Sequence, residues 1–194
     1  MNLANLLTLS RIPLMFIIVG LLYMNWTGAA TLAFLLFVVA GVTDWLDGLV
    51  ARRQGLVSTF GILMDALTDK VLMLGLMIAL VDLDKISIFL VLLILGREFM
   101  VTGMRLVAAT KGVVLSAERS GKQKTLTQIL SIGAFLFADM VRTDVEAWLG
   151  VELTDLAQWG DWVGMGLFLL ATVFTLTSGY NYFRKYGKLV FSEE

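Results

Sequence analysis

Four aspartates lie close together in the chain, between two strongly apolar runs. The stretch from residue 44 to residue 70 reads DWLDGLVARRQGLVSTFGILMDALTDK, and its aspartates are Asp44, Asp47, Asp65 and Asp69. Carboxylates that converge repel one another, and bound divalent cations relieve that repulsion. Two metal ions bridged by carboxylates stabilise both oxygens in a displacement at phosphorus. These residues therefore predict a metal site suited to phosphoryl chemistry.

The composition narrows the choice of metal. The chain contains neither histidine nor cysteine, so any metal must be bound by oxygen ligands. Oxygen ligands favour Mg²⁺, Mn²⁺ or Ca²⁺ over Zn²⁺ or copper. The alternative is that the aspartates cap helices or solvate a loop. That explanation fits an aspartate near a turn, but not Asp44 or Asp69, which lie well inside apolar segments.

The rest of the sequence predicts an all-α integral membrane protein. Of its 194 residues, 58% are hydrophobic, and its single proline suits long helices. A helix needs about 20 apolar residues to cross a bilayer. We predict one transmembrane domain over residues 1–194, with six spans at about 8–25, 29–50, 60–81, 86–110, 123–141 and 161–183. A cleavable signal peptide at residues 12–24 is disfavoured because five apolar runs follow it and its N-terminal flank is weakly basic.

The distribution of charge predicts the orientation of the spans. Ten basic residues fall on one side of the six-span arrangement, whereas only Lys85 and Arg142 fall on the other, which is acidic. Lysine and arginine concentrate in cytoplasmic loops of membrane proteins. We therefore expect a multi-pass protein of the cell (plasma) membrane, with both termini and the aspartates on the cytoplasmic side.

The spacing of the motif places its residues on two helix faces. Spacings of three, four and seven residues put side chains on one face of a helix. The second span carries such a stripe, made of Asp44, Asp47, Gly48 and Ala51, and the third span carries another, made of Gly61, Asp65 and Asp69. A tight hairpin at residues 52–59 would bring the stripes together. The glycines would allow helices or a ligand to approach closely.

Written as a pattern, this stretch is D-x2-D-G-x2-A-R-x8-G-x3-D-x3-D, and it resembles the signature of the CDP-alcohol phosphotransferase family. Three other segments are similar to the phosphatidylglycerophosphate synthases within that family. They are NLLTLSRIPL near the N-terminus, REFMVTGMRLVAATKG at 97–112 and GKQKTLTQ at 121–128. The resemblance runs from about residue 2 to residue 130, and beyond that it is mainly one of hydropathy.

The resemblance implies an enzyme with six membrane helices, usually a homodimer. Such enzymes transfer a phosphate-linked group from a CDP-linked donor to an alcohol and release CMP. Here the expected reaction transfers a phosphatidyl group from CDP-diacylglycerol to sn-glycerol 3-phosphate, giving phosphatidylglycerophosphate for phospholipid biosynthesis. The expected partners are these substrates, CMP and the lipid bilayer. No nucleic acid is expected.

The resemblance also assigns roles to the motif residues. It implies that two divalent ions, Mg²⁺ or Mn²⁺, are bound by Asp44, Asp47, Asp65 and Asp69. It further implies that Asp69 is the general base, which removes a proton from the acceptor hydroxyl. The CMP part of the donor would be bound by Gly48, Ala51, Arg52 and Gly61.

A phosphorylated acceptor needs cations of its own, and the fourth and fifth spans contain them. Arg97 and Arg105 lie on one helical stripe with Val101 and Met104. Arginines inside an apolar span are costly unless they have a partner. We expect the acceptor phosphate to be bound by Arg97, Arg105, Lys122, Lys124 and Thr125. Arg97 could instead pair with Glu98 or an aspartate, Arg105 could reach the interface, and the lysines could serve topology alone.

Two other functions fit the same residues less well. A relative with another acceptor, such as inositol phosphate, serine or choline, would keep the aspartate motif. The basic acceptor residues favour a phosphorylated alcohol. A transporter of divalent cations or protons would use the aspartates as a pathway. Transporters often contain inverted repeats and broken helices, and this sequence shows no internal repeat.

Overall fold

The computed structural model describes residues 3–54, 59–111, 113 and 119–191. The side chains of residues 3–9, 44–54, 59–67, 69, 119–122 and 188–191 lie outside that description, although their backbones are helical. Throughout the described residues the ordered elements are helices, with no strand. The predicted all-α class is therefore confirmed for this part of the chain.

Six long helices match the six predicted spans in order. They are α1 (Leu3–Leu22), α2 (Ala29–Gln54), α3 (Thr59–Asp82), α4 (Ile88–Thr110), α5 (Arg119–Met140) and α7 (Thr154–Phe191). Between α5 and α7 the chain forms a π-helical turn, η1 (Val141–Val145), and the short helix α6 (Glu146–Leu149). The sequence predicted a connection at 142–160. Instead, helical structure fills most of it, and α7 begins seven residues before the predicted span.

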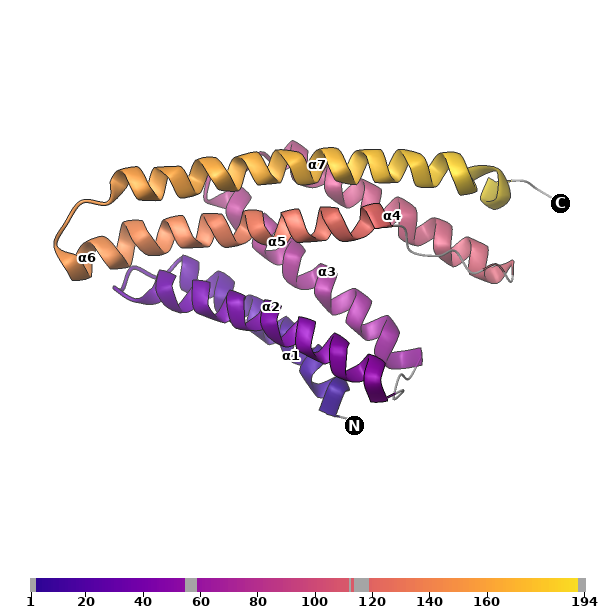
Figure 1. Cartoon of the computed structure of the whole chain (residues 1–194), viewed down its shortest axis with the longest axis horizontal. Helices are drawn as coiled ribbons and strands as arrows, with labels where there is room; N and C mark the ends of the chain where they lie inside the picture. Colours follow the sequence, from indigo (N-terminus) through magenta and orange to yellow (C-terminus); the bar gives the residue numbers. More distant parts are fainter. Residues whose placement is uncertain (1–2, 55–58, 112, 114–118, 192–194) are drawn as a thin grey trace.

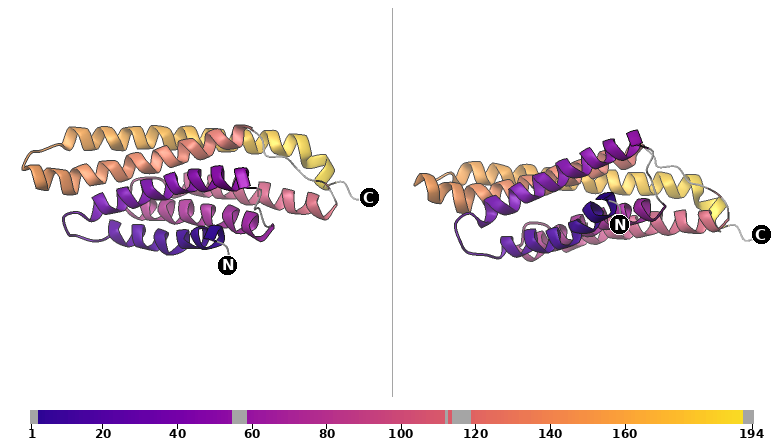
Figure 2. Two further views of the ribbon diagram at one scale, coloured as in Figure 1. Left: turned by 60° about the horizontal axis from the view of Figure 1, so that its bottom comes forward. Right: turned by 90° about the horizontal axis from the view of Figure 1, so that it is seen from below.

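The helices run roughly side by side in an elongated bundle. Helices α5 and α7 lie along each other, α1 packs against both α2 and α3, and α4 packs against α7 (Figure 1). The C-terminal end of α2 and the N-terminal end of α3 lie at the same end of the bundle (Figure 2). We call this the motif end. The opposite end holds the connections at 23–28, 83–87 and 150–153, and we call it the acidic end.

Small residues allow α5 and α7 to approach closely. A Cβ atom on Gly164 would lie 3.0 Å from the ring of Phe135, and one on Gly160 would lie 2.9 Å from the Cβ of Ala138. Phe135 belongs to an apolar core cluster that also draws residues from the other long helices. These glycines therefore serve packing within one chain.

The outer surface of the bundle is strongly apolar. Exposed side chains include Phe89, Phe99 and Leu106, each at least 68% accessible. Two helical stretches, Gln123–Leu149 and Thr154–Gly187, are long and apolar enough to cross a membrane. Shorter apolar stretches occur in α1 and α2, at Ser10–Leu22 and Ala29–Thr43. Such a surface suits contact with lipid.

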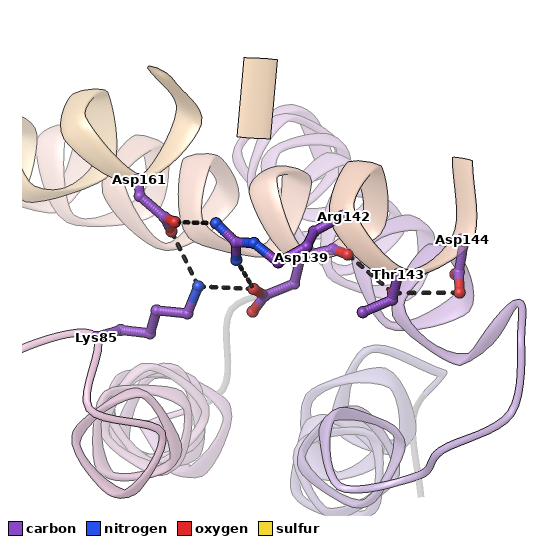
Figure 3. Close-up of polar contacts among 6 residues, drawn as sticks. All are labelled: Lys85, Asp139, Arg142, Thr143, Asp144 and Asp161. Atoms are coloured by element: carbon purple, nitrogen blue, oxygen red, sulfur yellow. Dashed lines mark hydrogen bonds and ion pairs between the residues drawn. The ribbon is translucent and has the colours of Figure 1, made fainter. Parts of the chain in front are cut away.

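At the acidic end, Asp144 of η1 fixes the start of α2. Its carboxylate accepts hydrogen bonds from the backbone N–H of Gly28 at 2.8 Å and of Thr31 at 2.6 Å, and from the Thr31 hydroxyl at 2.7 Å. The Thr143 hydroxyl adds a fourth contact at 3.2 Å (Figure 3). The first N–H groups of a helix have no partner within the helix. Asp144, only 1% exposed, supplies that partner from another helix.

A group of ion pairs joins three further segments at the acidic end. Lys85, in the α3–α4 connection, contacts Asp139 of α5 at 2.7 Å and Asp161 of α7 at 3.0 Å. Arg142 contacts the same two aspartates (Figure 3). Each carboxylate thus bridges two cations. Nearby, Tyr23 donates a hydrogen bond to Asp82 at 2.7 Å, which raises the pKa of Tyr23.

Candidate functional site

The aspartate motif occupies the facing ends of two consecutive helices. Asp44 and Asp47 lie on the C-terminal half of α2, and Asp65 and Asp69 on the N-terminal half of α3. The motif residues Gly48, Ala51 and Arg52 also lie on α2, and Gly61 on α3. The helical backbone predicted for both halves is therefore present. The side chains of these residues lie outside the description, so their predicted convergence and metal binding stay predictions.

The chemistry of the motif residues fits a pair of hard divalent cations. Each half contributes two carboxylates about one turn apart on a helical backbone, which places them on one face. Carboxylate oxygens are the ligands that Mg²⁺ and Mn²⁺ prefer. Asp44, Asp47, Asp65 and Asp69 would hold such ions, because carboxylates are the charged ligands that this histidine-free and cysteine-free chain offers and these four are grouped on two consecutive helices.

The predicted stripe on α4 is present, and most of it faces inward. Arg97, Val101 and Met104 are buried, each 9% exposed or less. Arg105 is the exposed member, and its Nε donates a hydrogen bond to the Tyr182 hydroxyl of α7 at 3.2 Å. Arg105 also lies 5.5 Å from the centroid of that ring. The two arginines therefore differ: Arg97 is enclosed by helices, and Arg105 lies against the edge of α7.

Arg97 is held between α4 and α7. Its Nη2 donates to the Ser178 hydroxyl at 2.7 Å, and its Nη1 contacts the Glu98 carboxylate at 3.1 Å. The neighbouring Gly179 leaves room for the side chain, because a Cβ there would lie 2.7 Å from Cγ of Arg97. The alternative pairing considered for Arg97, with Glu98, is thus seen in the structure.

Lys124 joins this group from α5. Its side chain is 9% exposed, and its ammonium pairs with the same oxygen of Glu98 that contacts Arg97. Lys70 of α3 also lies in the neighbourhood of Lys124. Lys70 itself donates to the Thr102 hydroxyl of α4 at 2.7 Å. Arg97, Glu98 and Lys124 form what we call the cation cluster.

The contact made by Lys70 relates the cation cluster to the aspartate motif. Lys70 is the residue after Asp69 on α3. Its partner Thr102 lies four residues, or about one helical turn, after Glu98 on α4. The cation cluster therefore lies about one turn from the place where α4 meets the motif helix. Asp69, the predicted general base, precedes Lys70 on α3, so its backbone lies near this contact.

The remaining predicted acceptor residues lie at the start of α5. Thr125 is half-buried beside Lys124. Lys122 lies on the helical backbone, but its side chain lies outside the description. Gln128, which was not among the predicted residues, is one turn beyond Lys124 and only 7% exposed. Its Nε2 has no hydrogen-bond partner among the described residues. A polar residue four positions after a lysine in an apolar helix was the signal available.

A cavity of about 380 Å³ lies at the acidic end, opposite the motif end. Its lining includes Trp26, Lys85, Asp139, Arg142 and Asp144. The charged groups there already bond to one another or to the start of α2. The residues that line this cavity therefore stabilise the acidic end of the bundle. The candidate functional site consists of the aspartate motif and the cation cluster.

Comparison with known proteins finds relatives that match most of the chain. The family model described as CDP-alcohol phosphatidyltransferase matches residues 1–177. A Bacillus subtilis protein named CDP-diacylglycerol–glycerol-3-phosphate 3-phosphatidyltransferase is 38% identical over 196 residues, which cover 95% of this chain and 94% of the relative. A Rickettsia typhi protein of the same name is 34% identical, with 94% and 96% covered. A Mycobacterium tuberculosis protein named probable phosphatidylglycerophosphate synthase is 36% identical, with 70% and 66% covered.

Proposed function

Because the chain belongs to the CDP-alcohol phosphatidyltransferase family, we propose that it transfers the phosphatidyl group of CDP-diacylglycerol to sn-glycerol 3-phosphate. The observation that carries this proposal is the match, over nearly the whole chain, to several relatives named for that reaction. The products are phosphatidylglycerophosphate and CMP. The buried cation cluster adds support, because it suits an acceptor that carries a phosphate.

The reaction needs a membrane setting that suits a lipid-linked donor. We propose that the six long helices cross the plasma membrane with the motif end on the cytoplasmic side. The apolar exterior supports the membrane crossing. The separation of acidic from basic residues supports the orientation. The acyl chains of the donor would then lie in lipid, with the CDP group at the motif end. A homodimer, which the family resemblance implies, is also proposed.

In the proposed mechanism the acceptor hydroxyl oxygen attacks the phosphatidyl phosphorus of the donor. The bond from that phosphorus to the CMP oxygen breaks, and CMP leaves with the bonding electrons. Asp69 takes the hydroxyl proton, which makes the oxygen a stronger nucleophile. Arg52, with Gly48, Ala51 and Gly61, would bind the CMP part, since a guanidinium offers planar donors to phosphate.

The four motif aspartates would hold two divalent ions, Mg²⁺ or Mn²⁺. Such ions neutralise a diphosphate and stabilise the leaving group. The acceptor phosphate would be held by Arg97 and Lys124, with Arg105, Lys122 and Thr125 nearby in the sequence of α4 and α5. Binding at the phosphate would direct the free hydroxyl towards the donor, which lowers the entropic barrier to attack.

The test is a CMP-release assay with purified protein in mixed micelles containing CDP-diacylglycerol. Parallel reactions receive glycerol 3-phosphate, inositol phosphate, serine, choline or no acceptor, each with Mg²⁺ or Mn²⁺ and again with EDTA. We expect release that needs both glycerol 3-phosphate and the metal. Release with another acceptor instead would overturn the assigned acceptor, and release unaffected by EDTA would overturn the assigned metal dependence.

A further inference from the structure

Glu98 is a single carboxylate shared by two buried cations. One oxygen, Oε1, contacts Nη1 of Arg97 at 3.1 Å and also the ammonium of Lys124. The two cations come from different helices, α4 and α5. Their side chains are 8% and 9% exposed, whereas that of Glu98 is 21% exposed. The anion is therefore the most accessible member of the cluster.

The charges explain why the cluster needs an anion. Arg97 and Lys124 bring two positive charges to one oxygen of Glu98, and among the described residues Glu98 is the carboxylate that both cations contact. Buried cations without a counter-ion are strongly destabilising. Glu98 reduces this repulsion in the structure as it stands. An anion with more charge and more oxygens would reduce it further.

A phosphomonoester has those properties. It carries a charge of about −1.5 to −2 at neutral pH and three acceptor oxygens. Glu98 contacts both cations through a single oxygen. In an exchange of anions the two cations would stay in place, and the Glu98 side chain, the more exposed partner, would move towards the surface. Arg97 is fixed by Ser178 and by its contact with Gly179, so the guanidinium would stay in place during an exchange.

We propose that Glu98 occupies the phosphate position of the acceptor site and must be displaced when the acceptor binds; this inference rests on the proposed function. Glu98 is thereby a specificity-determining residue. A phosphorylated alcohol can compete with it for Arg97 and Lys124, whereas an uncharged alcohol cannot. The carboxylate keeps the cations balanced before binding and screens out acceptors that lack a phosphate.

The experiment compares wild type with Glu98→Gln, which keeps the shape of the side chain and removes its charge. The Kd of inorganic phosphate and of glycerol 3-phosphate is measured by calorimetry in detergent, without donor, and KM and kcat are measured in the CMP-release assay. The matched control is Glu146→Gln, at the acidic end, where the side chain accepts a hydrogen bond from the Leu153 backbone N–H at 2.8 Å.

We expect Glu98→Gln to lower both Kd values and the KM for glycerol 3-phosphate by about tenfold, because a competing charge is removed. Glu146→Gln should change none of them. Phosphate binding that is unchanged or weaker in Glu98→Gln would overturn the inference, since Glu98 would then support the site rather than occupy it. If Glu98→Gln does not fold, Glu98→Asp is the test variant. Its shorter side chain reaches the cations less well, so the inference requires that it bind phosphate more tightly than wild type does.

The outcome separates this inference from the proposed function. The phosphate measurement uses no donor and does not depend on turnover. Metal-dependent CMP release with glycerol 3-phosphate, combined with unchanged phosphate affinity in Glu98→Gln, overturns only the role of Glu98. Tighter phosphate binding in a protein that releases no CMP with any acceptor overturns the proposed function, and with it the acceptor role given to the cluster.

Discussion

Arg97 of α4 lies against Gly179 of α7, so closely that a Cβ atom at Gly179 would come within 2.7 Å of Cγ of Arg97. The next residue back, Ser178, accepts a hydrogen bond from the same guanidinium. Ser178 and Gly179, two adjacent small residues of α7, thus fix the orientation of the Arg97 side chain on α4.

The contact predicts the effect of enlarging Gly179. Gly179→Val should push Arg97 away from Ser178 and raise the KM for glycerol 3-phosphate about tenfold, because a hydrogen bond to a charged group contributes about 1.5–3 kcal/mol. The kcat should change less than the KM. Gly166→Val is the matched control, since nothing lies within 4 Å of a Cβ at Gly166. An equal change in KM for both variants would contradict the prediction.

Replacing Gln128 with an apolar residue is expected to stabilise the protein. Its buried Nε2 has no hydrogen-bond partner among the described residues, and such a group destabilises a fold by about 1–3 kcal/mol. Gln128→Met has nearly the same volume and no polar nitrogen. We expect it to raise the Tm of the substrate-free protein in detergent by about 2–4 °C for each kcal/mol. A fall in Tm, measured by tryptophan fluorescence, would show that Nε2 has a partner.

Asp69 predicts a separation of binding from turnover. Asp69→Asn keeps the size of the side chain but cannot accept the hydroxyl proton, so kcat should fall by about 10²–10⁴-fold. Binding of the CDP donor should fall much less, and the Tm should stay near that of wild type. Donor binding is measured with a radiolabelled CDP-diacylglycerol in micelles. Turnover within a few-fold of wild type would remove the base assignment.

Replacing Asp144, which lies at the acidic end away from the motif, is expected to destabilise the protein. Asp144→Asn keeps one oxygen acceptor, but turns the other into an N–H₂ group that faces donors of Gly28 or Thr31. We expect a destabilisation of about 2 kcal/mol or more, seen as a lower Tm. Asp155→Asn is the control, because Asp155 is exposed in the first turn of α7. A similar fall in both variants would show that charge, not the cap, is responsible.

Much of the fold was predictable because its cause is local. Long apolar runs separated by polar residues predict the six long helices, and the positions of α2, α3 and α4 differ little from those expected. The segment after α5 was not predicted as helical. Its order depends on contacts from distant residues, such as the bonds from Asp144 to the start of α2, and on Gly150, whose left-handed backbone at φ 66° ends α6.

In the candidate site, too, the features that depend on a single helix were predictable from the sequence and those that depend on contacts between helices were not. The spacing of the aspartates predicts their helices, and the burial of Arg97, Val101 and Met104 follows from a helical stripe. The sharing of Glu98 by Arg97 and Lys124 was not predictable, because it depends on how α4, α5 and α7 lie against one another. Spacing within one helix carries no information on that relation. The Nε2 of Gln128, which lacks a partner within the described part of the chain, has the same origin.

The cap on α2 also bears on how the protein is made. Helix α2 carries Asp44 and Asp47, but the carboxylate that bonds to Thr31 near its start is 113 residues further along the chain. A ribosome that has just completed the aspartate motif has not yet synthesised Asp144. The bonds that cap the start of α2 can therefore form only after η1, which follows α5, has been synthesised. Completion of the helix that carries Asp44 and Asp47 is thus coupled in time to the synthesis of a segment at the opposite end of the bundle from the motif.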